Sequence, residues 1–372
     1  MQIDAIEVFH VALPLKQPYQ KAGRRFETLD TVLVRMRSGD AEGWGEASPG
    51  NGPLASAEWA TGAFACLRDW LAPAVVGRSV DSGESLTERL EPFRGNRFAK
   101  AALDTAWWDL KARREARPLH QILGGQREAV ELGVTFDQME SFDEFLAAIA
   151  RAADVGFGRV KLKFRPGWDV RMVDFVRKEF PTLTLHVDVE GALGLEHMEM
   201  LCRLDDFMLA MIEQPLAPDD LVGHAMVQET IRTPICLDES ITTVAQAEMA
   251  LELHSCKFIN LKPGRVGGLT PAVAIHDACR QADVACWIAA MPQSAIGVRA
   301  ALALAAMANC TYPADYFPSD EVLEQDLAEP LLPARAAPDG KMQIRLWTEP
   351  GLGISPDAGR LDRFCIARAE VR

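Results

Sequence analysis

Charged residues recur at the ends of short apolar runs in the middle of the chain. The set contains three lysines and three acids: Lys161, Lys163, Asp188, Glu213, Asp238 and Lys262. Its last four members lie 25, 25 and 24 positions apart. One strand, one helix and two short loops together need about that length. The spacing therefore predicts successive strand–helix units in a parallel barrel, with these side chains gathered at one end.

The residues around each charge are typical of a buried strand. Lys161 and Lys163 lie in the run 158–164, and their i, i+2 relation places both on one face of the strand. The other four charges follow apolar runs at 184–187, 209–212, 234–237 and 258–261. Such runs suit strands buried on both faces, with a functional residue where each strand meets its loop.

The combination of these residue types indicates proton abstraction. Three carboxylates at one end of a barrel suit a hard cation such as Mg²⁺, with Mn²⁺ as the alternative. Lysines on either side can move a proton to or from a carbon whose developing charge the metal absorbs. Taken singly, the lysines also fit a solvated strand face and each acid a helix cap. Buried together without an ion, however, they would be costly to desolvate, so we interpret them as one site.

Several motifs resemble one known family. They are KLK at 161–163, IEQPL at 212–216, LDES at 237–240, KPGRVGG at 262–268, GWGE at 43–46 and GNRFAK at 95–100. From about Ile3 to Gly353 the chain resembles the enolase superfamily. Within it, the motifs are similar to the muconate-lactonizing subgroup, nearest to o-succinylbenzoate synthases and N-acylamino acid racemases.

The resemblance implies a fold and a set of roles. The fold would be α/β, a modified (β/α)₇β barrel of the TIM type with an N-terminal α+β capping domain. The Mg²⁺ ligands would be Asp188, Glu213 and Asp238. Lys163 would be an acid/base on one face of the substrate and Lys262 its counterpart on the other.

Further roles follow from the same resemblance. Lys161 would lie beside Lys163, where a second ammonium group lowers its neighbour's pKa. Glu239 would not bind the metal itself but would interact with the residues that do. Arg265, Met291 and Thr135 would contact the substrate.

The chain departs from the family pattern in two places. Asp188-Val189-Glu190 stands where the family has Asp-Ala-Asn. We expect Glu190 to point to the same side as Asp188. It could join the metal coordination, pair with a lysine or another cation and raise a lysine's pKa, repel an acidic substrate, or select a substrate with a positive group. Residues 289–297 read AAMPQSAIG, where the family has GGMLETGIG, so Pro292 stiffens this loop and Gln293 replaces a glutamate.

The expected reaction is removal of a proton α to a carboxylate, with the enediolate charge stabilised electrostatically. Loss of a β-hydroxyl would then give dehydration of the o-succinylbenzoate synthase kind, which we favour. Return of the proton from the other lysine would give racemisation of an N-acylamino acid. A dipeptide epimerase and a cycloisomerase are further alternatives. A barrel that has lost activity and only binds a ligand is disfavoured by the complete set of acids and lysines.

Composition limits the partners. The net charge of −14 argues against nucleic acid, and no apolar run is long enough to predict a membrane span. The eight cysteines form no CxxC pair and the N-terminus shows no signal peptide, so we expect a reduced, cytoplasmic protein. The expected partner is a small-molecule carboxylate, and the subgroup implies a homo-oligomer.

The pattern divides the 372 residues into three segments. Residues 1–125 are expected to form the cap, 126–317 the barrel, and 318–372 a C-terminal segment that returns to the cap. Helices are predicted at Phe142–Ala153, Val170–Glu179, Val244–Leu253, Pro271–Gln281 and Ala295–Ala308. Two polar cap segments, Gln17–Phe26 and Ser48–Leu54, read as surface loops, which the resemblance places over the substrate. His186 shares the face of Asp188 and is expected to be a core histidine with its hydrogen bonds satisfied.

Overall fold

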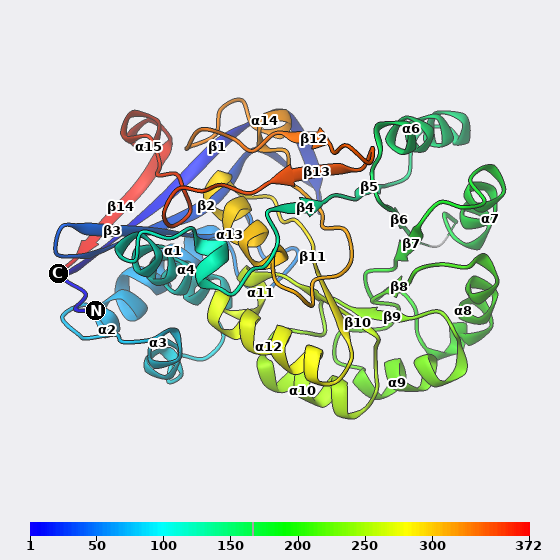
Figure 1. Ribbon diagram of the computed structural model, residues 1–372, viewed down its shortest axis with the longest axis horizontal. Coiled ribbons are helices and arrows are strands. Elements are labelled where there is room, and N and C mark those ends of the chain that lie inside the picture. The colour runs from blue at the N-terminus through cyan, green and yellow to red at the C-terminus, as the bar shows by residue number, and fades with distance from the viewer. Residues whose placement is uncertain (166) are drawn as a thin grey trace.

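The computed structural model describes residues 1–165 and 167–372. A cap and a barrel lie side by side, the cap on the left and the barrel on the right in Figure 1. The cap is built on an antiparallel sheet in the order β14-β1-β2-β3. Its elements are β1 (Ala5–Lys21), β2 (Arg24–Ser38), β3 (Ala41–Ala47), α1 (Ala60–Cys66), the π-helical turn η1 (Leu67–Leu71), α2 (Ala72–Val75), α3 (Gly83–Leu90), α4 (Arg97–Arg114), α5 (Leu119–Ile122) and β14 (Cys365–Val371).

Helix α4 packs directly on strand β3 because of the two glycines in the GWGE run. A Cβ on Gly45 would overlap the carbonyl oxygen of Ala102, and one on Gly43 would overlap that of Ala106. Glycine therefore permits a backbone approach that no other residue would allow. The cap core lies between this sheet and its helices, and it includes the buried side chains of Ile6 and Trp107.

The barrel sheet has seven strands, all parallel, and neighbours in the sheet follow one another in the chain. They are β5 (Val134–Phe136), β6 (Val160–Lys163), β7 (Leu185–Asp188), β8 (Ile212–Glu213), β9 (Ile235–Leu237), β10 (Phe258–Leu261) and β11 (Ala285–Ile288). The curled parallel sheet beside an antiparallel cap confirms the predicted fold class.

Helices cover the outside of this sheet, as the right side of Figure 1 shows. They are α6 (Phe142–Val155), α7 (Val170–Glu179), α8 (Met198–Leu204), α9 (Leu221–Thr230), α10 (Val244–Glu252), α12 (Leu269–Gln281) and α13 (Ala295–Ala305), with the short turns η2 (Leu195–His197), η3 (Asp205–Phe207) and α11 (Pro263–Val266). Polar side chains accept a hydrogen bond from the first turn of several of these helices and so fix where they begin. These capping residues are Ser141, Asp169, Asp220, Thr243 and Ser294.

An irregular segment, 309–315, takes the eighth position between the first and last barrel strands. It bridges β11 through Cys310 and Cys286, and it meets the chain ahead of β5 through Ala314 and Leu132. Backbone hydrogen bonds from Asp315 N to Ile288 O (3.0 Å) and from Gly133 N to Ala314 O (2.9 Å) tie both edges to it. The barrel is thus closed by a segment that is not a regular strand.

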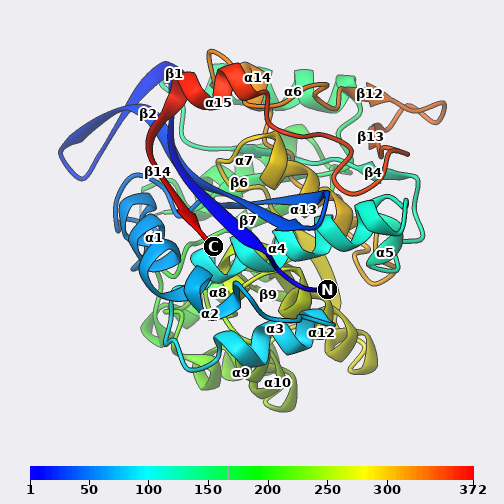
Figure 2. The same ribbon diagram turned by 90° about the vertical axis from the view of Figure 1, so that its left-hand side faces the viewer.

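The chain beyond 318 contacts both parts. Its elements, together with the strand ahead of the barrel that pairs with them, are β4 (Ala129–Glu131), α14 (Ser319–Val322), β12 (Ala334–Ala336), β13 (Met342–Arg345) and α15 (Ala358–Phe364). Strand β13 pairs with β4, whereas β14 pairs with β1, with Val371 opposite Ile6. Figure 2 shows β14 and β1 crossing the molecule together. The segment borders at 125 and 317 stay predictions.

The segment Gln17–Phe26 is a strand hairpin instead of the surface loop expected. Its residues extend β1 and β2, which turn at Ala22 and Gly23, and most of its side chains are exposed. The rings of Tyr19 and Phe26 stack across the two strands with centroids 5.2 Å apart. Cross-strand aromatic pairs of this kind stabilise a hairpin, which explains why a polar stretch forms strands here.

Two buried acids connect the cap to the barrel. Glu46, at the end of β3, accepts hydrogen bonds from Ser294 N (2.9 Å) and Gly297 N (2.9 Å) at the start of α13. Asp104, on α4, accepts hydrogen bonds from Thr270 N (2.9 Å) and Thr270 Oγ1 (2.6 Å) at the start of α12. Carboxylates at helix N-termini satisfy free backbone N–H groups there, so these contacts hold the cap on the barrel. Among the described residues, no helix is long and apolar enough to cross a membrane.

Candidate active site

The strand register brings the predicted charges together. Lys163 is the register partner of Asp188 on the next strand, and Asp188 is the partner of Glu213 on the strand after that. Asp238 directly follows β9 and Lys262 directly follows β10. The side chains therefore lie at the carboxyl ends of neighbouring parallel strands, where barrel enzymes have their active sites.

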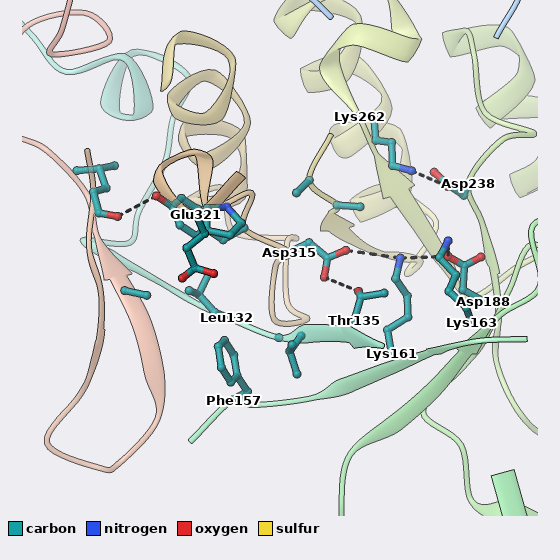
Figure 3. A pocket seen from close by; sticks show the side chains of 18 of the residues that line it. Leu132, Thr135, Phe157, Lys161, Lys163, Asp188, Asp238, Lys262, Asp315 and Glu321 are labelled. Carbon is teal, nitrogen blue, oxygen red and sulfur yellow. Dashed lines mark hydrogen bonds and ion pairs between the residues drawn. The ribbon is translucent and has the colours of Figure 1, made fainter. Parts of the chain in front are cut away.

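A cavity of about 710 Å³ opens over these strand ends. Figure 3 shows Lys161 and Lys163 of β6 and Lys262 from the end of β10 reaching into it, with Asp188 and Asp238 between them. The other polar or charged residues that line it are Thr135, Glu190, Glu239, Asp315, Tyr316, Asp320 and Glu321. Glu213 lies below the cavity and is fully buried.

Lys161 is the most enclosed of the three lysines. Its Nζ lies 3.2 Å from Asp188 Oδ2, 3.3 Å from Glu213 Oε2 and 3.5 Å from Asp315 Oδ2. Burial opposes its charge, but the three carboxylates outweigh burial and raise the pKa of Lys161 well above its ordinary value. Lys161 is therefore protonated at neutral pH, at the wall of the cavity.

Lys163 contacts two carboxylates near the open side. Its Nζ donates to Asp188 Oδ2 (2.9 Å) and to Glu190 Oε1 (2.6 Å). Burial and the repulsion from Lys161 lower the pKa of Lys163, yet the attraction of Asp188 and Glu190 is larger and the net shift is upward. The expected lowering of the Lys163 pKa by Lys161 is present, but Asp188 and Glu190 outweigh it in this arrangement.

Glu190 reaches Lys163 by a different route from the one expected. Strand β7 ends at Asp188, and the backbone at Glu190 is left-handed, with φ of 52°. The side chain is 60% exposed and comes from the rim of the cavity. The predicted pairing with a lysine is thus present, whereas the predicted continuation of the strand pleat is not.

Asp238 is paired with two cations on the opposite side of the cavity. Lys262 Nζ donates to Asp238 Oδ2 (2.7 Å), and Arg265 donates to Oδ1 of the same carboxylate. Burial raises the pKa of Asp238, but the two cations outweigh burial and hold it well below its ordinary value. Glu239 points to Arg265 at 3.8 Å, and burial together with the charge of Asp238 raises the pKa of Glu239 to about 8.

Glu213 is held by a buried network inside the barrel. Asn260 Nδ2 donates to Glu213 Oε1 (2.7 Å), and the Nε2 atom of His186 lies 3.3 Å from Oε2. The other ring nitrogen of His186 is 3.0 Å from the hydroxyl of Tyr312. Burial lowers the pKa of His186 to about 4, so the ring is neutral. His186 has both ring nitrogens partnered, as expected, and it also orients Glu213.

The donor set suits a divalent cation. Asp188, Glu213 and Asp238 offer carboxylate oxygens from three neighbouring strand ends, which is the ligand chemistry that Mg²⁺ prefers. In the side-chain positions of the described residues, no three acids, histidines or cysteines are grouped closely enough to hold an ion. Instead, lysines and Arg265 lie against these oxygens. The residues therefore fit a metal by their chemistry, and in this structure ammonium and guanidinium groups contact the same carboxylate oxygens.

Comparisons with known proteins agree with this arrangement. Residues 144–360 match the family model described as enolase C-terminal domain-like, and residues 3–124 match the mandelate racemase / muconate lactonizing enzyme N-terminal domain. The chain belongs to the mandelate racemase / muconate lactonizing enzyme family of the enolase superfamily. The predicted resemblance is confirmed.

Relatives within this family are enzymes. The chain is 36% identical to an o-succinylbenzoate synthase of Geobacillus kaustophilus over 98% of its own length and 96% of the relative's. It is 38% identical to an N-succinylamino acid racemase of Thermus thermophilus, with 92% of each chain covered. A solved structure of an enolase superfamily member from Enterococcus faecalis V583 superposes with a TM-score of 0.94 at 31% identity, over 100% of both chains. The chain is accordingly an enzyme of the enolase superfamily.

Asp315 is a site residue of this family member that the sequence reasoning missed. It lines the cavity, forms an ion pair with the buried Arg159, and accepts a hydrogen bond from Thr135 Oγ1 (3.3 Å). Its segment, 311–315, contains a proline and no apolar run, so nothing marked it as part of the barrel. Its position along the chain could have identified it, because Asp315, like Asp188 and Asp238, stands at the end of a segment that occupies one position in the barrel.

The residues expected to contact the substrate fall into two groups. Thr135 lines the main cavity. Arg265 does not line it but donates a hydrogen bond to Asp238, which does. Met291 instead lines a neighbouring cavity of about 260 Å³, together with Tyr19, Phe26 and Leu54 of the cap. Met291 also lines a smaller space next to Lys262. Both cap segments predicted to lie over the substrate therefore meet the barrel at Met291.

Proposed function

We propose that the chain abstracts a proton α to a carboxylate, and that its reaction is a dehydration of the o-succinylbenzoate synthase kind. One observation carries the proposal: three lysines and two strand-end acids line a single cavity. The names of the relatives support both the reaction class and the substrate class. Racemisation of an N-succinylamino acid is the second candidate, because lysines approach the cavity from β6 and from the end of β10.

In this proposal Lys163 takes the α-proton. For dehydration, the C–H electron pair forms a double bond, the β-hydroxyl leaves, and it departs as water with a proton from a lysine. For racemisation, Lys262 returns a proton to the opposite face of the same carbon. Either step needs one lysine to be neutral, and Asp188 and Glu190, which contact Lys163, oppose that state for Lys163.

A divalent metal would be held by Asp188, Glu213 and Asp238, and enzymes of this family generally depend on one. When bound, the cation supplies positive charge that offsets the charge developing on the substrate carboxylate. We propose Mg²⁺, with Mn²⁺ as the alternative. Lys161, which contacts both Asp188 and Glu213, would hold these two carboxylates in place.

The remaining substrate would extend toward the cap. The cavity between Tyr19, Phe26, Leu54 and Met291 is apolar on several sides. A smaller space shares Met291 with it and is also lined by Lys262. Apolar lining with few polar groups is typical of small-molecule sites. We propose that the acyl or ring portion of the substrate lies on this side, while its reacting carboxylate faces the lysines.

The test is proton exchange in D₂O with Mg²⁺. Incubation with o-succinylbenzoate precursor or with each enantiomer of an N-succinylamino acid is expected to give product formation, α-deuteration, or both. We expect Lys163→Ala to lose activity by about 10²–10⁴-fold. The matched control is Lys178→Ala, since Lys178 is exposed and pairs only with Asp174. Equal loss in both variants, or full activity in Lys163→Ala, would contradict the proposal.

The same variants separate the two candidates. In a racemase, Lys163→Ala should stop exchange from one enantiomer, and Lys262→Ala should stop it from the other. In a one-base dehydratase, Lys262→Ala should still exchange the α-proton. Loss of exchange from both hands in each single variant would exclude the scheme with one lysine on each face.

We also propose a homo-oligomer in the cytoplasm that acts on a small-molecule carboxylate. All eight cysteines are free thiols, which suits a reducing compartment. Apolar side chains of adjacent helices α9 and α10 are exposed: Val222, Met226 and Met249 at 61%, 49% and 50%. Such a patch is typical of a protein–protein contact. Sedimentation of the wild type and of Met226→Lys would show whether this surface joins copies of the chain.

A further inference from the structure

A second cavity lies between the cap and the barrel, apart from the candidate active site. Its volume is about 350 Å³, which is within the range of small-molecule pockets. One wall comes from α3 and the start of α4, and the other from α10, α11 and the start of α12. It shares no lining residue with the cavity that holds the three lysines. A ligand bound in this second cavity would therefore not occupy the space of the catalytic substrate.

The cap wall of this cavity is basic, although the whole chain carries a net charge of −14. Arg94, Arg97 and Lys100 all line it. Lys100 donates to the carbonyl oxygen of Phe93 (2.5 Å). In the part of the chain that the structure describes, neither arginine has a carboxylate oxygen within 4.0 Å. Both arginines thus line the cavity without forming an ion pair among the described residues, although Glu58 acts on Arg97 electrostatically.

Both arginines act electrostatically on Lys100, the third cation of this wall. Burial lowers the pKa of Lys100, and the charges of Arg97 and Arg94 lower it further, while Glu58 acts in the opposite direction. The Glu58 carboxylate is itself occupied by Phe98 N (3.1 Å). An anion placed between these cations would relieve the repulsion.

Two acids also line the cavity, and neither neutralises the arginines. The carboxylate of Asp104 is buried and accepts hydrogen bonds from Thr270 N and Oγ1, so it points toward the barrel helix. Glu91 is exposed and forms no ion pair within the described residues. The basic cap wall therefore favours a negatively charged group on a ligand.

The rest of the lining is largely apolar. It is formed by Leu86, Leu90, Phe93, Val244, Val266 and Pro271. A small inorganic anion would leave this surface uncovered, and a neutral hydrocarbon would leave the arginines unpaired. A carboxylate with an apolar body satisfies both walls.

The cavity also touches the loop that carries Lys262. Val266 and Gly267 line it, one and two residues after Arg265, which pairs with Asp238. The same loop packs against α4, since a Cβ on Gly264 would lie 2.8 Å from the ring of Phe98. A ligand in the cavity would therefore contact the segment between Lys262 and α12.

We propose that this crevice binds an amphipathic organic carboxylate, with its charged group on Arg94 and Arg97 and its apolar body against α3 and the 266–271 segment. The site is separate from the catalytic cavity and does not depend on which reaction occurs there. A second copy of the chain is the competing occupant.

The test uses octanoate as the probe and calorimetry on the full chain. Saturable binding of octanoate is expected, with acetate and octylammonium at least about tenfold weaker because each lacks one of the two recognised features. Arg94→Gln/Arg97→Gln should weaken octanoate about tenfold or more, and Thr87→Trp should block the cavity while keeping the charges. The matched control is Arg89→Gln, an exposed α3 arginine outside the cavity, and it should bind like the wild type.

Hydrogen exchange locates the site without any activity measurement. Octanoate should protect peptides that cover residues 83–100 and 263–271, and not those that cover 133–136. Binding that persists unchanged in both cavity variants, or protection only near 133–136, would overturn the proposal. So would octanoate failing to bind while Thr87→Trp dissociates an oligomer, because a second copy would then occupy the crevice.

Discussion

Buried acids at the barrel mouth and at the cap–barrel interface differ in their partners. Asp188 and Asp238 face lysines and an arginine, whereas Glu46 and Asp104 face backbone N–H groups and hydroxyls. At the mouth, burial raises the carboxyl pKa but the cations lower it more. At the interface burial prevails, and the pKa of Glu46 and of Asp104 rises to about 7.

The difference separates acids that can exchange partners from acids that cannot. An ammonium or guanidinium group sits on a long side chain and can turn aside for a metal or a substrate. A backbone N–H at the start of α12 or α13 moves only with its helix. We therefore expect substitutions at the mouth to act on metal binding and turnover, and substitutions at the interface to act on folding stability.

The largest effect is expected for Glu213→Gln. The change keeps the size of the side chain but removes a negative charge from the three-acid set. We expect Mg²⁺ affinity to fall by more than about 100-fold. Even the loss of a residue that only hydrogen-bonds to a metal ligand lowers metal affinity by about 10–100-fold. Calorimetry with Mg²⁺ measures the affinity, and circular dichroism checks the fold. Unchanged Mg²⁺ affinity in a folded variant would remove Glu213 from the proposed ligand set.

An interface substitution should instead destabilise the fold. Glu46→Ala leaves the backbone N–H groups of Ser294 and Gly297 and the hydroxyl of Ser294 without this acceptor. We expect the free energy of unfolding to fall by about 2–4 kcal/mol. Denaturant unfolding gives this value, and Glu88→Ala on the exposed side of α3 is the control, expected within about 0.5 kcal/mol of wild type. If Glu46→Ala lost as much Mg²⁺ affinity as Glu213→Gln, the interface acids would not differ in function from the acids at the barrel mouth.

The interface acids also predict a pH dependence of stability. Glu46 has a pKa of about 7 when folded, against an ordinary value of 4.5. Between these values the folded state keeps a proton that the unfolded chain releases, so the free energy of unfolding falls as pH rises from 4.5 to 7. We expect Glu46→Gln to show a shallower fall over this window in urea unfolding series. An identical slope in the variant and the wild type would mean that Glu46 is ionised throughout.

The smallest effect is expected for Glu190→Asn. Glu190 is largely exposed, but its hydrogen bond helps to raise the pKa of Lys163. Removing it should shift the rising limb of the pH–rate profile to lower pH. Glu190, Asp320 and Glu321 also line the same cavity, so the variant should lose preference for substrates with a positive group. If neither the limb nor the substrate ranking changes, Glu190 has no part in the reaction.

The sequence predicted the parts of the site that depend on strand register. Lys163, Asp188 and Glu213 occupy neighbouring register positions because each ends an apolar run of similar length. Helices α7 and α12 lie where periodicity placed them, with differences of at most two residues at their ends. Local spacing determines these features, so they can be read without a structure.

The missed features depend on contacts distant in the chain. Asp315 closes the barrel from a segment with no strand signal, and its partner Arg159 lies 156 positions away. Lys161 lowers the pKa of Lys163 as expected, but Asp188 on the next strand outweighs it and decides the net direction. Met291 faces the cap because of how the two parts dock, which no local pattern records.

The pairing of β14 with β1 affects how the protein is made. Val371 lies opposite Ile6, so β1 is synthesised well before β14, the strand with which it pairs along this edge. During that time β1 has one open edge with alternating apolar residues, and such edges recruit other chains. The order of synthesis thus leaves the nascent cap sheet exposed to aggregation for longer than the barrel, and a chaperone that shields β1 would raise the yield of folded enzyme.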